Sequence, residues 1–329
     1  QLIGEGYRTL PTLIYQTFMS DVVTDRPLAA TIAVIVIAIT AFMFLSQRWF
    51  SQRKTIEMSA LRPIEPKDTT IIKKILAHLM IYSITFLVII PTIIVFINSL
   101  MESTGRVMTG NFTFNNYTQA FKVMAKPLMN TLIYSLIALV IVIIIGIIVA
   151  YTSVRRKNKI SSTLDVIAMF PFIIPGSVLG IALLISFSGR PFALAGSALI
   201  IIISYSIRRL PYTIRSSSAI LRQIDLSVEE ASQSLGANKL KTFTKVTFPM
   251  MIAGVMSGAI MSWLSIITEI SASIILYTFA TKTLSIHIFL YVQDGYFGIA
   301  SAMSSVLLLI TILALVLSLK LTGNKEISL

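Results

Sequence analysis

The chain has 329 residues, of which 55% are hydrophobic and only 12% are charged. A soluble domain of this size needs far more polar surface, so the composition excludes one and indicates a polytopic membrane protein. The net charge of +13 is spread over several short loops, which is typical of loops beside membrane lipid and argues against a nucleic-acid-binding patch. Cysteine is absent, and His78 and His287 lie far apart, so neither a disulfide nor a metal site is expected.

Seven stretches without charged residues are long enough, or nearly long enough, to cross a bilayer as helices. They are continuously apolar, whereas the strands of a membrane barrel alternate, so we predict an all-α polytopic fold with seven transmembrane helices. In chain order the stretches are residues 27–47, 75–101, 131–154, 166–189, 191–207, 246–268 with an apolar continuation to 277, and 295–319.

The charges outside these stretches predict the orientation of the chain. When the seven spans are threaded alternately, 20 of the 27 Lys and Arg residues fall on one side of the membrane. Positively charged loops stay in the cytoplasm. This asymmetry predicts an N-terminal segment outside and both the C-terminus and residues 226–250 in the cytoplasm.

Two parts of the sequence resemble each other. The segment "TLPTLIY" from Thr9 precedes "PLAATIAV", and "TLSIHIF" from Thr283 precedes "FGIASAMS". Internal duplication is common in transporters, although two apolar segments can also match by accident. We expect residues 1–46 to be the tail of a first half, 47–74 a basic cytoplasmic linker, and 75–329 a second half with six spans.

One polar stretch, "EEASQSLGANKLKTFTKVTFP" from Glu229, interrupts the apolar sequence. Its spacing of Glu, Gly and Pro resembles the EAA signature of permease subunits of binding-protein-dependent ABC importers, which lies on the cytoplasmic loop before the penultimate helix. Ser232, Val246 and Phe248 depart mildly from the family pattern. The resemblance assigns an ATPase-coupling role to Glu229, Glu230, Ala231, Ser232, Leu235, Gly236, Ala237, Val246, Phe248 and Pro249.

The residues of this stretch suit that role. Residues 226–235 favour a short helix, Gly236 can adopt the positive φ that ends a helix, and a second helix can start from Ala237. Two short helices at an angle would fit into a cleft of a cytosolic partner. The alternative is an amphipathic loop whose lysines touch anionic lipid.

The resemblance covers essentially the whole chain. The stretch "TEISASIILYTFATKTLSI" from Thr268 is most similar to fused two-half permeases of the ferric-iron type, whose relatives include carriers of aminoethylphosphonate. The family resemblance implies an inner-membrane permease of six core helices. It also implies three partners: an external substrate-binding protein, a first permease half, and a cytoplasmic ABC ATPase dimer that holds ATP and Mg. No cofactor is expected in this chain.

Four residues are candidates for the translocation path. Glu269 is flanked by long apolar runs, and a carboxylate at that depth is costly unless it faces protein, water or a partner; a position near the outer headgroups is the alternative. Pro171, Pro175 and Gly176 interrupt the span 166–189, which frees backbone groups to line a cavity or merely kinks the helix. Arg208 and Arg209 are expected to anchor to lipid phosphates, and Gly146, Gly180, Gly254 and Gly258 to mark close helix packing.

The sequence contains no GxxxxGK[ST] motif, so a P-loop for ATP is not expected in this chain and ATP hydrolysis would belong to a partner subunit. The preferred hypothesis is a non-enzymatic transport subunit that carries ferric iron. The alternatives are the same mechanism for aminoethylphosphonate or another small anion, an ion-coupled secondary transporter, and a scaffold without transport.

Overall fold

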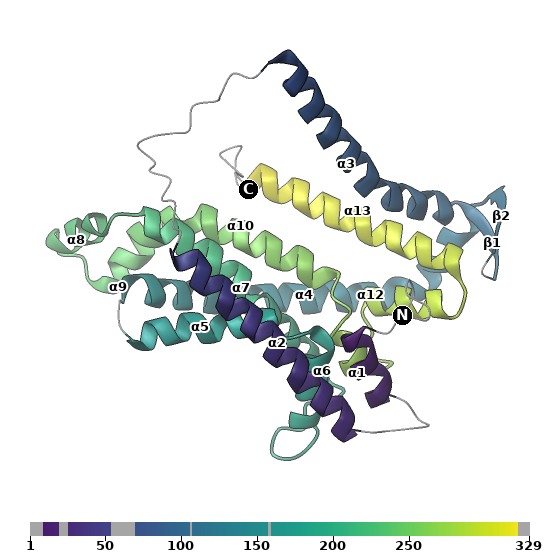
Figure 1. Cartoon of the computed structure of the whole chain (residues 1–329), viewed down its shortest axis with the longest axis horizontal. Coiled ribbons are helices and arrows are strands. Elements are labelled where there is room, and N and C mark those ends of the chain that lie inside the picture. Colours follow the sequence, from purple (N-terminus) through teal and green to yellow (C-terminus); the bar gives the residue numbers. More distant parts are fainter. Residues whose placement is uncertain (1–8, 20–25, 54–69, 106, 157–158, 322–329) are drawn as a thin grey trace.

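The computed structural model describes residues 9–19, 26–53, 70–105, 107–156 and 159–321 (Figure 1). The N-terminal helices are α1 (Leu10–Met19), α2 (Arg26–Arg53) and α3 (Ile71–Ser99), followed by an antiparallel hairpin of β1 (Met101–Thr104) and β2 (Val107–Phe112). The remaining elements are α4 (Asn115–Arg155), α5 (Lys159–Ile173), α6 (Gly176–Ser186), α7 (Ala198–Gln223), α8 (Leu226–Ser234), α9 (Lys239–Thr242), the π-helix η1 (Phe243–Thr247), α10 (Phe248–Ile267), α11 (Ser273–Leu276), α12 (Leu284–Gln293) and α13 (Phe297–Leu321).

The all-α membrane fold is confirmed, but the number of clear spans differs from the predicted seven. Among the described residues, five helices are long and apolar enough to cross a membrane, and a sixth span results if the bent pair α5–α6 is counted as one. The remaining predicted span, 191–207, corresponds to a loop followed by the first part of α7. Four arginines lie in the second part of α7. The helix is therefore too charged to count as an apolar span, although its 26 residues reach about 39 Å.

Two helix boundaries differ from the ends of the charge-free stretches. Helix α4 begins at Asn115 rather than near Thr131, because the polar residues ahead of the apolar run continue the same helix. The apolar continuation after α10 is not helical extension, since the chain breaks at Thr268 and turns into the short helix α11. Apolar runs locate the part of a helix in lipid, whereas helix ends follow backbone hydrogen bonding.

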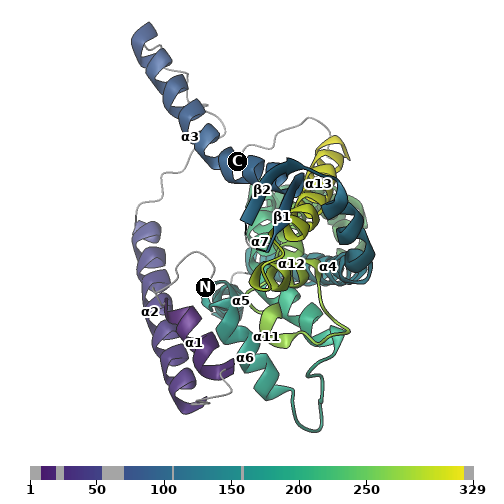
Figure 2. The same ribbon diagram turned by 90° about the vertical axis from the view of Figure 1, so that its right-hand side faces the viewer.

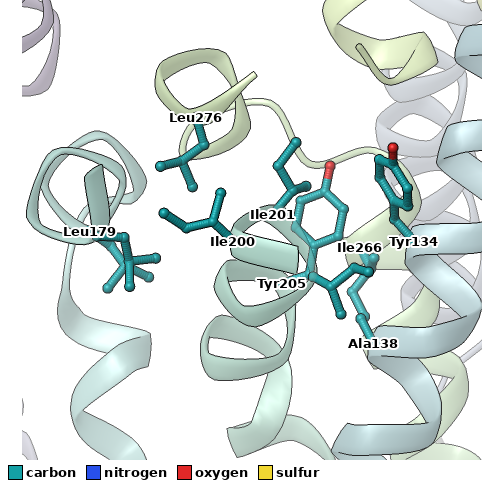
Figure 3. Packing of buried hydrophobic residues seen from close by; sticks show 10 residues of the cluster. Tyr134, Ala138, Leu179, Ile200, Ile201, Tyr205, Ile266 and Leu276 are labelled. Atoms are coloured by element: carbon teal, nitrogen blue, oxygen red, sulfur yellow. The ribbon is translucent and has the colours of Figure 1, made fainter. Parts of the chain in front are cut away.

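The core lies where α4, α6, α7, α10 and α11 meet. Figure 3 shows Tyr134 and Ala138 of α4 facing Ile201 and Tyr205 of α7, with Ile266 of α10 beside them. Leu179 and Leu276 extend the same cluster toward α6 and α11 (Figure 3). These side chains are less than a tenth exposed, so this cluster fixes the elements around which the candidate site is built.

The glycines predicted to allow close packing do so. A Cβ on Gly258 would lie 2.8 Å from the Cα of Thr213, and one on Gly146 would lie 2.8 Å from the Thr213 side chain. Gly254 faces Ile220, and Gly180 faces the backbone of Ala272. Helix α7 is therefore held in direct backbone-level contact with both α4 and α10.

The N-terminal helices occupy different places. Helices α1 and α2 pack on α5 and α6 through a small cluster that includes Ile14, Val36 and Val178. The first part of α3 extends away from the other helices (Figure 2), whereas its C-terminal part packs along α13. The two matched sequence segments have the same local structure, a helix of 10 residues followed by a long apolar helix. The division into two halves stays a prediction, and residues 1–8, 20–25 and 54–69 of the predicted tail and linker lie outside the described residues.

Candidate functional site

The predicted coupling residues form a compact helical turn, here called the α8–α9 segment (residues 225–249). Asp225 caps α8, because its Oδ1 accepts a hydrogen bond from the backbone N–H of Ser227 at 2.8 Å. The same hydrogen bond lowers the pKa of the Asp225 carboxyl. The cap explains why the segment breaks from α7 at Ile224 and starts a new helix at Leu226.

Gly236 ends α8 as the sequence predicted. Its φ is +89°, a left-handed conformation that favours glycine. The Gly236 N–H donates to the Gln233 carbonyl at 2.9 Å and the Ala237 N–H donates to the Ser232 carbonyl at 3.2 Å. This pair of bonds is a Schellman motif, which satisfies the last carbonyls of the helix.

The second arm of the segment starts two residues later than predicted. Asn238 caps α9 by accepting the N–H of Lys241 at 2.8 Å, and the hydroxyls of Ser232 and Thr242 lie 3.1 Å apart across the bend. The chain then passes through η1 directly into α10, where Pro249 occupies the first turn, a position that tolerates a missing N–H. The α8–α9 segment is thus continuous with a membrane-spanning helix.

Glu229 fastens the α8–α9 segment to the end of α4. Its Oε1 accepts from Arg155 Nε at 2.8 Å and its Oε2 accepts from the Tyr151 hydroxyl at 3.1 Å. Arg155 also donates to the Ile224 carbonyl at 3.0 Å. Arg155 and Tyr151 are functional candidates that the sequence analysis missed, because an arginine that follows an apolar run was counted only for its charge.

The face of the segment away from the membrane helices is exposed. Leu235 is 90% exposed and Leu240 is 71% exposed, although the segment around them is polar and basic. Glu230, Ala231 and Gly236 are also exposed, whereas Ser232, Ala237, Val246 and Phe248 are half-buried. Together with Leu226, which is 50% exposed, these two leucines provide an apolar contact for a partner.

Glu269 lies in a second site, here called the charge cluster (Arg208, Arg209 and Glu269). Glu269 is 4% exposed, and its two carboxylate oxygens accept from Arg208 Nη1 and Arg209 Nη2. The backbone N–H of Ala272 donates to Glu269 Oε1 at 3.2 Å. The expectation that Arg208 and Arg209 anchor to lipid phosphates is therefore wrong, since a buried carboxylate takes both guanidinium groups.

The other path candidates lie at the bend between α5 and α6, which turns by 107°. Pro171 lies inside α5, and Pro175 is the residue before α6. A Cβ on Gly176 would lie 2.6 Å from Arg208 Nη1 and 2.5 Å from the Ser271 Cβ. The structure thus brings Gly176 against the charge cluster, and Pro171 marks the bend rather than the cluster.

The chain is similar to known transport permeases. Residues 142–322 match the family model of the binding-protein-dependent transport system inner membrane component. The chain is 29% identical over 318 residues to the ferric transport system permease protein FbpB of Actinobacillus pleuropneumoniae, with 94% of this chain and 46% of that protein covered. It is 28% identical over 187 residues to the molybdate/tungstate transport system permease protein WtpB of Pyrococcus furiosus, with 57% and 73% covered.

Solved structures share the fold. A bacterial ABC transporter involved in the import of the acidic polysaccharide alginate has a TM-score of 0.59 at 16% identity, with 79% of this chain and 99% of that chain covered. The chain spans less than half the length of FbpB. The family model covers more than half of this chain, which therefore belongs to the family of binding-protein-dependent transport system inner membrane components.

Proposed function

We propose that the chain works as the transmembrane permease of an ATP-driven importer and that the α8–α9 segment is its contact with a cytoplasmic ATPase dimer. The observation that carries the proposal is a projection with exposed Leu235 and Leu240 that is fastened to a membrane helix by a buried ion pair. Exposed leucines on a segment that is held in place by an ion pair suit docking into a protein cleft better than loose contact with lipid headgroups.

The attachment of the α8–α9 segment to the membrane helices also supports a route for mechanical coupling. A displacement of the segment is applied to α4 through Glu229 and Arg155, and to α10 through η1. Helix α7 lies between these two helices in close glycine-mediated contact, and packed helices move as bodies because interiors are nearly incompressible. Binding of ATP and Mg by the ATPase would thus convert an inward-facing path into an outward-facing one.

The assembly around the chain follows from this assignment. The α8–α9 segment and the C-terminus face the cytoplasm, in agreement with the excess of Lys and Arg on that side. An extracytoplasmic binding protein docks on the opposite face, and a first permease half supplies the second coupling segment. Residues 1–46 are assigned to that half, and 75–329 to the second.

Ferric iron is the proposed cargo, because the relative FbpB aligned over 94% of the chain is a ferric transport permease by name. The named relative WtpB and the two largely buried arginines, Arg208 and Arg209, favour a small anion as the second candidate. An ion-coupled secondary transporter would not use the α8–α9 segment, so this alternative has less support than the ATP-driven importer.

The test is ATP hydrolysis in proteoliposomes that hold the full-length permease, its ATPase and its binding protein. The binding protein is supplied loaded with ferric iron, loaded with a phosphonate, or empty. Stimulation by the iron-loaded form alone supports both importer and cargo. Stimulation by the phosphonate-loaded form alone keeps the importer and replaces the cargo, and the absence of any stimulation contradicts the importer.

A further inference from the structure

The charge cluster lies where two helices are interrupted. Helix α10 ends at Ile267, and Glu269 lies in the turn between α10 and α11. Pro211 lies inside α7, two residues after Arg209, and proline has no N–H to continue the helical hydrogen-bond pattern. The carboxylate and the arginines that bind it therefore lie beside points at which regular helix structure is interrupted.

The bend between α5 and α6 meets the same point. This pair of helices turns by 107°, and Gly176 at the start of α6 packs so closely that an added Cβ would lie 2.6 Å from Arg208 Nη1. The Arg209 carbonyl, in contrast, accepts a hydrogen bond from the Ser262 hydroxyl of α10 at 3.1 Å. Arg208 is thus packed against α6, whereas the backbone of Arg209 is bonded to α10.

The charge cluster separates two groups of packed side chains along α7. The first part of α7 packs with α4, α6 and α11 through residues that include Ile201 and Tyr205 (Figure 3). The last part of α7 packs with α4 and α10 through residues that include Leu221 and Met251, and Phe243 of the α8–α9 segment packs against this second group. The cluster thus lies between an inner part of the bundle, attached to the α8–α9 segment, and an outer part.

The charges within the cluster do not balance. Arg208 and Arg209 share the Glu269 carboxylate, their side chains are only 15% and 16% exposed, and no other carboxylate contacts either of them within the described residues. Arg209 Nε is buried without a hydrogen-bond partner. Because Arg208 lies 10 residues after the start of α7 and 15 before its end, the cluster is far from both ends of the helix. An uncompensated charge at such a depth is costly, so access of water would lower the free energy of the charged groups.

We propose that the charge cluster is a latch, an ion-pair contact that holds the inner and outer parts of the bundle together in the resting state and opens during transport. In the structure the ion pairs are formed and the latch is closed. Movement of the inner part, caused by ATP binding at the α8–α9 segment, draws Arg209 away from Glu269 and lets water reach the cluster. This inference rests on the importer function proposed above and identifies the residues that hold its resting state.

A latch predicts opposite effects for the two kinds of charge removal. Glu269→Gln leaves two neighbouring positive charges without a carboxylate, so the latch should stay open and ATP hydrolysis without binding protein should rise several-fold. Arg209→Gln leaves a balanced pair of Arg208 and Glu269, so the latch should stay closed and stimulation by the loaded binding protein should fall several-fold. An ion pair that only stabilises the fold would lower both activities whichever partner is removed.

The experiment measures opening through a single cysteine at Ser273, a fully buried position whose hydroxyl donates to the Glu269 carbonyl at 3.0 Å. The full-length permease, otherwise free of cysteine, is held with its ATPase in lipid nanodiscs and treated with a small water-soluble thiol reagent. A non-hydrolysable ATP analogue should raise the reaction rate of the parent protein by roughly tenfold or more, as for a buried group exposed by local opening. Glu269→Gln should react at the raised rate without the analogue, and Arg209→Gln should react slowly even with it. Arg222→Gln, the same substitution at an exposed position of α7, should behave as the parent protein does.

Uptake of cargo by the same proteins in liposomes separates this inference from the importer function. Where ATP-dependent uptake occurs, a reaction rate that the analogue leaves unchanged, or equal rates for Glu269→Gln and Arg209→Gln, would overturn the latch and leave the importer standing. If Glu269→Gln does not fold, Arg209→Gln decides alone, because parent-like opening in that variant overturns the latch and loss of opening supports it. If no uptake occurs, the importer function is contradicted, and the rates of the two variants without nucleotide decide the latch.

Discussion

Glu229 and Glu230 are neighbours in sequence with opposite environments. The side chain of Glu229 is 5% exposed and paired with Arg155, whereas Glu230 is exposed. Both carboxylates were predicted to belong to the coupling segment, and nothing in their local sequence separates them. Glu229 is buried and Glu230 is exposed because the end of α4 lies beside α8. This contact joins Arg155 and Glu229, which are 74 positions apart in the sequence.

We expect Glu229→Gln to lower the free energy of unfolding by about 3 kcal/mol, because it leaves the largely buried Arg155 without its carboxylate. The measurement is unfolding by denaturant in mixed micelles. Glu230→Gln is the matched control and should change stability by less than about 0.5 kcal/mol, as for an ordinary surface position. Equal effects of the two substitutions would contradict the burial difference.

Gly236 was predicted from sequence to hold a positive φ, and the structure confirms it. No atom outside its own neighbours lies within 4 Å of an added Cβ, so the requirement comes from the backbone alone. A glycine whose positive φ ends a helix can be predicted from sequence, because the requirement arises from its own backbone conformation.

Gly236→Pro should uncouple ATP hydrolysis from transport while the membrane helices still insert. Proline cannot adopt the positive φ and lacks the N–H that bonds Gln233. Gly236→Asn is the control, since asparagine tolerates the left-handed region, and it should keep most of the coupling. Uptake per ATP is the readout, and normal uptake with proline would refute the role of the bend.

Helix α7 differs most from what its own sequence predicted. Its apolar first part was predicted as a short span, but its continuation through Arg208 and Arg209 was not. The carboxylate that pairs with these arginines lies 61 and 60 residues further along the chain. Single-sequence patterns locate apolar faces but not such long-range partners. The close packing of α7 was easier to predict, because glycines spaced four apart are a local signal.

Gly258→Ala should destabilise the α7–α10 contact by about 1–3 kcal/mol, because the added methyl group would meet the Thr213 Cα at 2.8 Å and the Tyr212 carbonyl oxygen at 3.0 Å. Thermal unfolding in detergent measures the effect. Gly189→Ala is the control, with nothing within 4 Å of its added Cβ. A stability loss as large at Gly189 would show that the packing argument fails.

For the whole chain, composition and the distribution of charge predicted the membrane fold. Neither of them predicted that α1 and α2 pack against α5 and α6. That packing joins apolar side chains to other apolar side chains, so no sequence pattern distinguishes these residues from those that face lipid. The predicted sidedness, in contrast, depends only on total loop charge and needs no tertiary information.

The absence of native cysteine allows this sidedness to be measured with single cysteines. A cysteine at the exposed position Gln233 should react with an impermeant maleimide only after the cell membrane is opened. A cysteine at the exposed position Gly189, in the loop before α7, should react in intact cells. The reverse pattern would contradict the proposed orientation.

Coupling of an ATPase to the membrane helices through the α8–α9 segment is tested by measuring cargo uptake and ATP hydrolysis in proteoliposomes with Leu235→Asp. Leu235 is 90% exposed, so a charge there should leave the fold intact while removing the apolar contact with the ATPase. We predict that stimulation of ATP hydrolysis by the loaded binding protein and uptake are both lost, and that both are retained in Leu235→Met. Unchanged stimulation and uptake in the aspartate variant would contradict the account.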